Sequence, residues 1–88
     1  MKELYLIVKR KTDGYEAIYS ADDIVKAISA QKALIGNDEL TADIVREARK
    51  TVTDDEVREV SANIEKANYD RLYNDDEEVY IFHMPARD

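Results

Sequence analysis

The sequence has no cysteine, and its 88 residues include only one histidine, one proline and two glycines. Without cysteine there are no disulfide bonds, thiolate zinc sites or cysteine nucleophiles, and a single histidine cannot form a histidine-based metal cluster. Gly14 and Gly36 are too far apart for a glycine-rich phosphate loop. No run approaches the roughly 20 apolar residues of a membrane-spanning helix, and the Met-Lys-Glu-Leu start lacks the apolar segment of a signal peptide. We therefore expect a cytoplasmic protein with no membrane partner.

Acidic side chains, by contrast, are in excess. The sequence has 20 acidic and 13 basic side chains, which gives a formal net charge of -7, and 44% of its residues are hydrophobic. That apolar content is enough for a small core and too high for an acidic disordered tail, and a chain of this length has room for one folded unit. We therefore expect a single domain spanning residues 1–88.

The negative charge is concentrated in the second part of the chain. Residues 1–50 carry nine basic and nine acidic side chains, whereas residues 51–88 carry four basic and eleven acidic ones, so the second part accounts for the whole net charge. Such a field attracts cationic partners and repels nucleic acid. The one local basic cluster, residues 9–11, is too small for the several phosphate contacts that nucleic-acid binding usually needs. Direct nucleic-acid binding is therefore disfavoured.

The apolar patterns predict three strands and three helices. Strands are expected over residues 3–10, 15–19 and 78–84, and helices over residues 20–35, 38–50 and 53–74. Gly14 suits the turn of a hairpin, and Ser20, three residues before Asp23, predicts the start of the first helix. Thr53 and Glu56 form a capping box at the start of the third. Pro85 is expected to end the last strand.

Together these elements predict a small α+β domain of order ββαααβ. The first and last strands are apolar on both faces, so each needs neighbours, and we expect the last strand to pair with the first. The prediction is thus a three-stranded sheet with all helices packed on one face.

Few residues point to catalysis or to a cofactor. The acidic run at 74–78 has no glycine at which a calcium loop could turn, and clustered exposed carboxylates do not form the cleft that acid–base catalysis needs. His83 lies within the last strand without an evident nucleophile beside it. We expect no enzyme activity, no metal site and no cofactor.

The third predicted helix instead suggests an interaction surface. Tyr69 and Tyr73 are four residues apart, so on a helix they share a face, and that face should be partly exposed. Tyrosine combines apolar area with a hydroxyl group and is enriched at interfaces. The predicted partner-binding residues are Glu59, Glu65, Tyr69, Asp70, Tyr73, Asp75, Asp76, Glu77 and Glu78.

In its size, acidity, lack of cysteine and acid–tyrosine stretch from Tyr69 to Tyr80, the chain resembles small phage-encoded inhibitors of bacterial defence, such as the type II anti-CRISPR proteins. The resemblance implies a protein that binds a basic, nucleic-acid-handling partner, with carboxylates occupying the positions of phosphates. Association driven by charge in this way should be fast and sensitive to salt.

An alternative is an antitoxin-like or regulatory module that acts through the exposed face of its sheet. If all helices lie on one side, the residues left uncovered on the other are expected to include Tyr5, Ile7, Tyr80 and Phe82. That face could bind another protein or a second copy of the chain in a homodimer.

Overall fold

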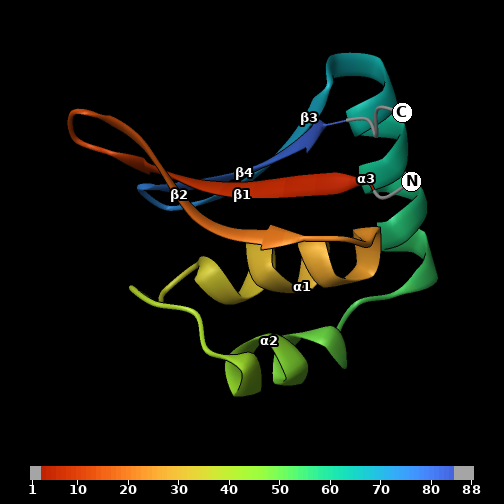
Figure 1. Cartoon of the computed structure of the whole chain (residues 1–88), viewed down its shortest axis with the longest axis horizontal. Coiled ribbons are helices and arrows are strands. Elements are labelled where there is room, and N and C mark those ends of the chain that lie inside the picture. Colours follow the sequence, from red (N-terminus) through yellow and green to blue (C-terminus); the bar gives the residue numbers. More distant parts are fainter. Residues whose placement is uncertain (1–2, 85–88) are drawn as a thin grey trace.

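The computed structural model describes residues 3–84, which form a four-stranded antiparallel sheet and three helices (Figure 1). The strands are β1 (Leu4–Lys11), β2 (Gly14–Ala21), β3 (Tyr69–Asn74) and β4 (Glu77–Met84), in the order β2-β1-β4-β3. Leu4 pairs with Met84 and Lys9 with Val79, so the expectation that the last strand lies beside the first is confirmed. Pro85 lies outside the described residues.

The prediction of a three-stranded sheet is wrong, because the third helix ends seven residues earlier than expected and a further strand follows it. Asn68 takes a left-handed conformation, with φ 64°, and its backbone N–H donates to the Ile64 carbonyl, which ends the helix. Asparagine is one of the few residues that adopts this conformation at modest cost. The order is therefore ββαααββ, and Tyr69, Asp70 and Tyr73 lie on a strand.

Polar side chains cap the three helices, α1 (Ile24–Leu34), α2 (Ala42–Arg49) and α3 (Asp54–Ala67). The predicted capping box of Thr53 and Glu56 is confirmed at the start of α3. The start of α1 differs from the prediction, since Asp23 rather than Ser20 is the cap and accepts a hydrogen bond from the Lys26 backbone N–H. Ser20 belongs to β2, where it pairs with Leu6.

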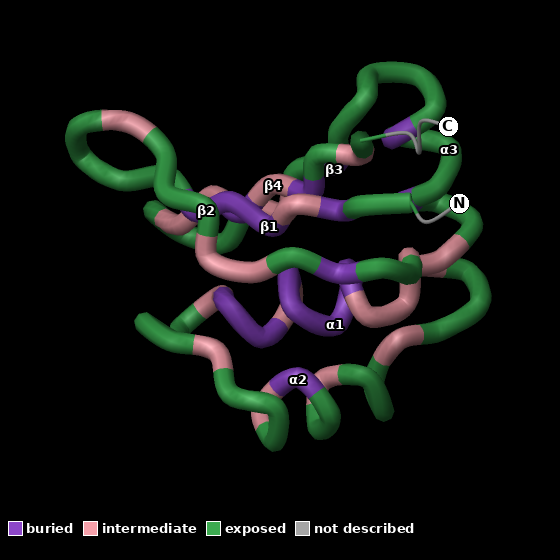
Figure 2. Tube along the Cα trace, in the orientation of Figure 1, coloured by how far each residue is buried: buried purple, intermediate pink, exposed green. Residues whose placement is uncertain are grey.

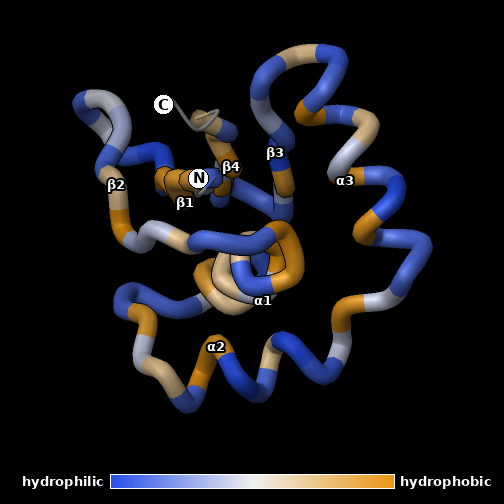
Figure 3. The backbone as a smooth tube through the Cα atoms, turned by 45° about the vertical axis from the view of Figure 1, so that its right-hand side comes forward, coloured by the Kyte–Doolittle hydropathy of each residue, from blue (hydrophilic) through white to orange (hydrophobic). Residues whose placement is uncertain are grey.

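The core lies between the sheet and the helices. Ile7 of β1 and Val79 and Ile81 of β4 are fully buried, and they belong to one apolar cluster with residues of all three helices. In Figure 1, α1 lies along one face of the sheet, α2 lies beyond α1, and α3 runs beside β3 and β4. Figure 2 shows the same layering, with the buried segments in purple. In Figure 3 the hydrophobic colour follows β1, β4 and the inner turns of α3. The opposite face of the sheet has no helix over it within residues 3–84.

None of the helices in residues 3–84 combines the length and the apolar character needed to cross a membrane.

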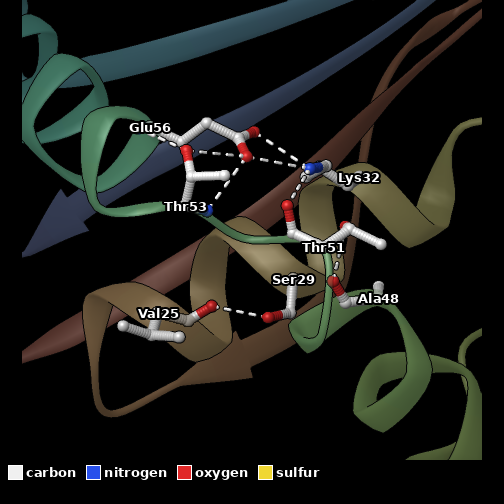
Figure 4. Close-up of polar contacts among 7 residues, drawn as sticks. All are labelled: Val25, Ser29, Lys32, Ala48, Thr51, Thr53 and Glu56. Atoms are coloured by element: carbon white, nitrogen blue, oxygen red, sulfur yellow. Dashed lines mark hydrogen bonds and ion pairs between the residues drawn. The ribbon is translucent and has the colours of Figure 1, made fainter.

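A lysine joins the three helices at one corner (Figure 4). Lys32 Nζ of α1 donates to the Thr51 carbonyl that follows α2, at 3.1 Å, and to Glu56 Oε1 of α3, also at 3.1 Å. Glu56 additionally accepts from the Thr53 backbone N–H at 3.1 Å. The hydrogen bond from Lys32, together with that from Thr53, holds the pKa of the Glu56 carboxyl below its ordinary value of 4.5.

Replacing Lys32 by methionine should therefore reduce the pH dependence of stability. A lowered folded-state pKa contributes stability that is present at neutral pH and is lost as the pH falls through that pKa. The pair is partly exposed, so we expect Lys32→Met to lower the free energy of unfolding near pH 7 by about 0.5–1 kcal/mol. Below about pH 4 that difference should shrink. Urea unfolding at both pH values measures it. The matched control is Lys26→Met, which replaces a lysine of the same helix that has no ion pair in the described residues. If stability depends on pH equally in the two variants, Lys32 is not the cause of the lowered Glu56 pKa.

Candidate interaction surfaces

The structure separates the residues predicted to form one acidic face. Glu59 and Glu65 are exposed on α3, without an ion-pair partner among residues 3–84. Asp75 and Asp76 are exposed in the turn between β3 and β4, and strand β3 lies between them and α3. Six extended residues span about 20 Å. The predicted acids of the helix and of the turn thus lie far from one another.

Glu77 and Glu78 point to opposite faces of β4 and each has partners within the chain. Glu77, on the helix side, accepts from the Gly36 backbone N–H at 2.8 Å and from Lys9 Nζ at 3.3 Å. Glu78, on the other side, accepts from Arg10 Nη1 at 2.8 Å and from the Tyr80 hydroxyl at 2.7 Å. These two bonds, that from Tyr80 being the stronger cause, hold the pKa of the Glu78 carboxyl below its ordinary value. Both glutamates therefore have intramolecular roles.

Asp70 is buried, and its carboxylate accepts hydrogen bonds from side chains of the same chain. Gln31 Nε2 donates to Asp70 Oδ2 at 3.1 Å and to the Val79 carbonyl at 3.1 Å, while Asn63 Nδ2 donates to Asp70 Oδ1 at 2.8 Å. Asp70 is 7% exposed and Gln31 is 2% exposed. The carboxylate thus links α1, α3 and the sheet, and a partner has little access to it.

A second group of exposed carboxylates without an ion pair in the described residues, apart from Glu59 and Glu65 of α3, lies at the end of the sheet where both hairpins turn. Figure 1 shows the β1–β2 turn, the β3–β4 turn and the α1–α2 loop together at the left of the view, opposite α3. The bonds from Gly36 and Lys9 to Glu77 join the loop to the second turn. We call this region the turn end, and its exposed acids without an ion pair in the described residues are Asp13, Asp38, Glu39, Asp75 and Asp76.

The second surface is the side of the sheet away from the helices, here called the open face. Its members follow from strand alternation and register. It carries five of the seven aromatic residues. The open face consists of Leu4, Leu6, Val8 and Arg10 on β1; Tyr15, Ala17 and Ser20 on β2; Tyr69, Arg71 and Tyr73 on β3; and Glu78, Tyr80, Phe82 and Met84 on β4.

The aromatic rings of the open face form a connected group. The ring centroids of Tyr80 and Phe82 are 5.7 Å apart, those of Tyr69 and Phe82 5.9 Å, and those of Tyr15 and Tyr80 5.5 Å. Tyr69 and Tyr73 are 40% and 59% exposed, so the expectation that they are at least partly exposed is confirmed, although on a strand. A contiguous apolar surface of this kind is typical of an interaction site.

Two residues expected on the open face lie on the other side. Tyr5 and Ile7 alternate with Leu6 and Val8, so they point toward the helices, where they are 8% and 0% exposed. The expectation that they need cover is therefore wrong, whereas Tyr80 and Phe82 do lie on the open face.

His83 lies on the helix side of β4, stacked on Tyr5 with a ring-centroid distance of 4.8 Å. Its Nε2 is 3.2 Å from Glu3 Oε2, which also accepts from the Tyr5 hydroxyl at 2.7 Å. Burial, reinforced by Glu3, raises the pKa of Tyr5 to about 12. Within residues 3–84, no group of three or more histidine, aspartate or glutamate side chains converges closely enough to hold a metal ion.

Comparison of this chain with protein-family models, with curated proteins and with solved structures found no match.

Proposed function

We propose that this chain is a non-enzymatic binding protein that engages a basic partner protein through the turn end. The observation that carries the proposal is the gathering of five exposed carboxylates, from three separate connections, with no ion pair in the described residues. A basic partner supplies the missing counter-charges. Elsewhere the acids of α2 and α3 are partly neutralised by their own neighbours, as in Asp43 with Arg46 and Asp55 with Arg58.

A nucleic-acid-handling protein is the partner class that fits this surface. Such proteins bind phosphates with clustered lysine and arginine side chains, and carboxylates on short, connected turns present a similar array of negative charge. The resemblance to anti-CRISPR inhibitors supports the same assignment. The turn end would then occupy the partner's phosphate-binding surface and block it.

Removing charge from the turn end should weaken this interaction. In the variant Asp38→Asn, Glu39→Gln, Asp75→Asn, Asp76→Asn, four carboxylates become amides of similar shape. Affinity capture from a bacterial lysate, with calorimetry on the captured protein, is expected to give a basic partner whose affinity falls at least about tenfold in the variant. Raising the salt concentration from about 0.05 M to about 0.5 M should produce a loss of the same kind.

The matched control removes four charges from α3 instead, in the variant Asp54→Asn, Asp55→Asn, Glu59→Gln, Glu65→Gln. It has the same net charge as the turn-end variant and should retain the partner. If the α3 variant loses the partner and the turn-end variant keeps it, the binding surface is the acidic helix predicted from the sequence, and the present proposal is wrong.

The open face favours a second candidate function, that of a regulatory module which binds a protein through apolar contacts. The supporting observation is the connected group of exposed aromatic rings. In this case Tyr80→Asp or Phe82→Asp should abolish binding of the captured partner, and salt should have little effect.

A further inference from the structure

The open face has almost no charge, although the chain is rich in charged residues. Within residues 3–84, strand alternation places only three charged side chains on this face, namely Arg10, Arg71 and Glu78. Depletion of charged residues, together with enrichment of tyrosine and arginine, is the composition of the core of a protein–protein interface.

Bulky and small side chains are divided between the two halves of the open face. The half formed by β3 and β4 carries four of its five aromatic residues, whereas the half formed by β1 and β2 is mostly aliphatic and small. The bulky half contains Tyr69, Arg71, Tyr73, Glu78, Tyr80, Phe82 and Met84, and the other half contains Leu4, Leu6, Val8, Arg10, Tyr15, Ala17 and Ser20. Outside the row of Arg10 and Tyr15, the side chains of the β3–β4 half are therefore larger than those of the β1–β2 half.

This division makes the face complementary to itself. A two-fold axis that runs parallel to the strands, between β1 and β4, places β1 over β4 of a second copy and β2 over β3 of that copy. The bulky half of each copy then covers the small half of the other, and the match occurs twice. Two sheets packed in this way lie about 10 Å apart with their strands roughly aligned.

The strand register gives the facing positions in this arrangement. Residues paired across the sheet share a row, so Phe82 faces Leu6 of the second copy and Tyr69 faces Ser20 of the second copy. In the first row, Arg10 faces Glu78 of the second copy, which matches opposite charges, and Arg10 has 58% of its side chain exposed. In the rows of Leu6 and Val8, large side chains of β3 and β4 thus meet smaller ones of β1 and β2, and in the row of Arg10 the exposed Tyr15 faces the exposed Tyr73 of the second copy. Arg10 and Glu78 are paired within each copy, and the axis sets each of these charges opposite the unlike charge of the other copy.

We propose that the open face binds the open face of a second copy of this chain about that two-fold axis. Four strands and four rows of side chains cover roughly 19 by 24 Å, so two faces together bury about 1,000 Å². That area is near the lower limit for a specific interface. The dimer should therefore dissociate in the micromolar range.

A second copy fits this face better than the other occupants do. Single-stranded nucleic acid would stack on the rings, but two arginines neutralise too few phosphates on a chain of net charge -7. A basic partner would be repelled by the two arginines and is attracted by the turn end instead. The proposal goes beyond the function proposed above, since the turn end takes no part in the contact.

Two matched substitutions test the dimer. Ala17 is exposed on the open face, and Ala62 is exposed on α3, on the other side of the molecule. Sedimentation equilibrium of the unmodified chain is expected to show a monomer–dimer equilibrium. Ala17→Asp should weaken dimerisation at least about tenfold and Ala62→Asp should leave it unchanged, with circular dichroism showing that both are folded. If Ala17→Asp does not fold, Ser20→Asp on the same strand replaces it.

The effect of salt distinguishes dimerisation from partner binding. Two copies with the same net charge repel each other, so higher salt should strengthen dimerisation, whereas it should weaken capture of a basic partner. A chain that stays monomeric up to about millimolar concentration overturns the dimer and leaves the proposed function standing. A dimer that Ala62→Asp disrupts and Ala17→Asp does not would also overturn it, because another surface would then be in contact.

Crosslinking tests the direction of the two-fold axis. Because the sequence has no cysteine, only the introduced thiols can react. Ala17 and Arg71 lie in the same row on opposite edges of the face, so Ala17 of one copy faces Arg71 of the other. A mixture of Ala17→Cys and Arg71→Cys chains should crosslink with a bis-maleimide reaching about 8 Å, while either chain alone, with its thiols about 17 Å apart, should not. Equal crosslinking by one variant alone overturns the arrangement.

Discussion

Replacing Gln31 by leucine is expected to lower the free energy of unfolding by about 2–4 kcal/mol, although leucine has a similar volume and is more apolar. The Gln31 amide is 2% exposed and supplies hydrogen bonds to the Asp70 carboxylate and to the Val79 carbonyl. Leucine removes both donors. Asp70, which is 7% exposed, would then be left with the Asn63 amide, and a buried charged group with too few partners is costly. Urea denaturation measures the change.

The double variant Gln31→Leu, Asp70→Leu separates this cause from poor packing of the leucine. Replacing both partners of a buried hydrogen bond by apolar groups is often nearly neutral, so the double variant should regain most of the lost stability and lie within about 1 kcal/mol of the original chain. Asn63 is exposed, and water can satisfy its freed amide. If the losses of the two single substitutions simply add, the buried network has no special role.

The strand pairing could be predicted because it follows from a strong local signal. The first and last strands are apolar on both faces, a pattern that favours neighbouring central positions in a sheet over its edges. The capping box of Thr53 and Glu56 was equally clear, since both of its hydrogen bonds are local in sequence.

The sequence did not predict strand β3 because its residues fit both the helical and the strand periodicity. Tyr69 and Tyr73 are four apart, which suits a helix face, but with Arg71 between them they also alternate along one side of a strand. The deciding residue is Asn68, whose left-handed conformation ends α3. An asparagine at that point is a signal for a helix end that sequence reasoning could have used.

The turn end could not be found by counting charges along the chain. Asp13, Asp38 and Glu39 lie in the part of the sequence whose net charge is zero. They lie at the same end as Asp75 and Asp76 only because β1 and β4 are neighbours and both hairpins turn at one end. Glu77 and Glu78 are in the same acidic run, yet strand alternation turns them toward internal partners.

Glu77→Ala is expected to cost about 2–3 kcal/mol of stability, more than a surface glutamate usually does. Lys9 lies on the buried side of β1, and its side chain is only 10% exposed. Its ammonium group has two partners, Glu77 Oε1 at 3.3 Å and the Asn37 carbonyl at 3.4 Å. Removing Glu77 leaves a buried charge with one neutral acceptor, and it also removes the acceptor of the Gly36 backbone N–H. Thermal and urea unfolding measure the loss.

Lys9→Met, which breaks the same ion pair from the other side, should cost less than about 1 kcal/mol. Methionine fills the volume of the lysine stem, and Glu77, whose side chain is 33% exposed, keeps its bond from Gly36 and is otherwise solvated. The two substitutions thus remove one interaction at unequal cost, because only one of the charges left behind is buried. Equal losses would show that Lys9 reaches water as readily as Glu77 does. Glu77 would then be an ordinary surface acid, available to a partner along with Asp75 and Asp76.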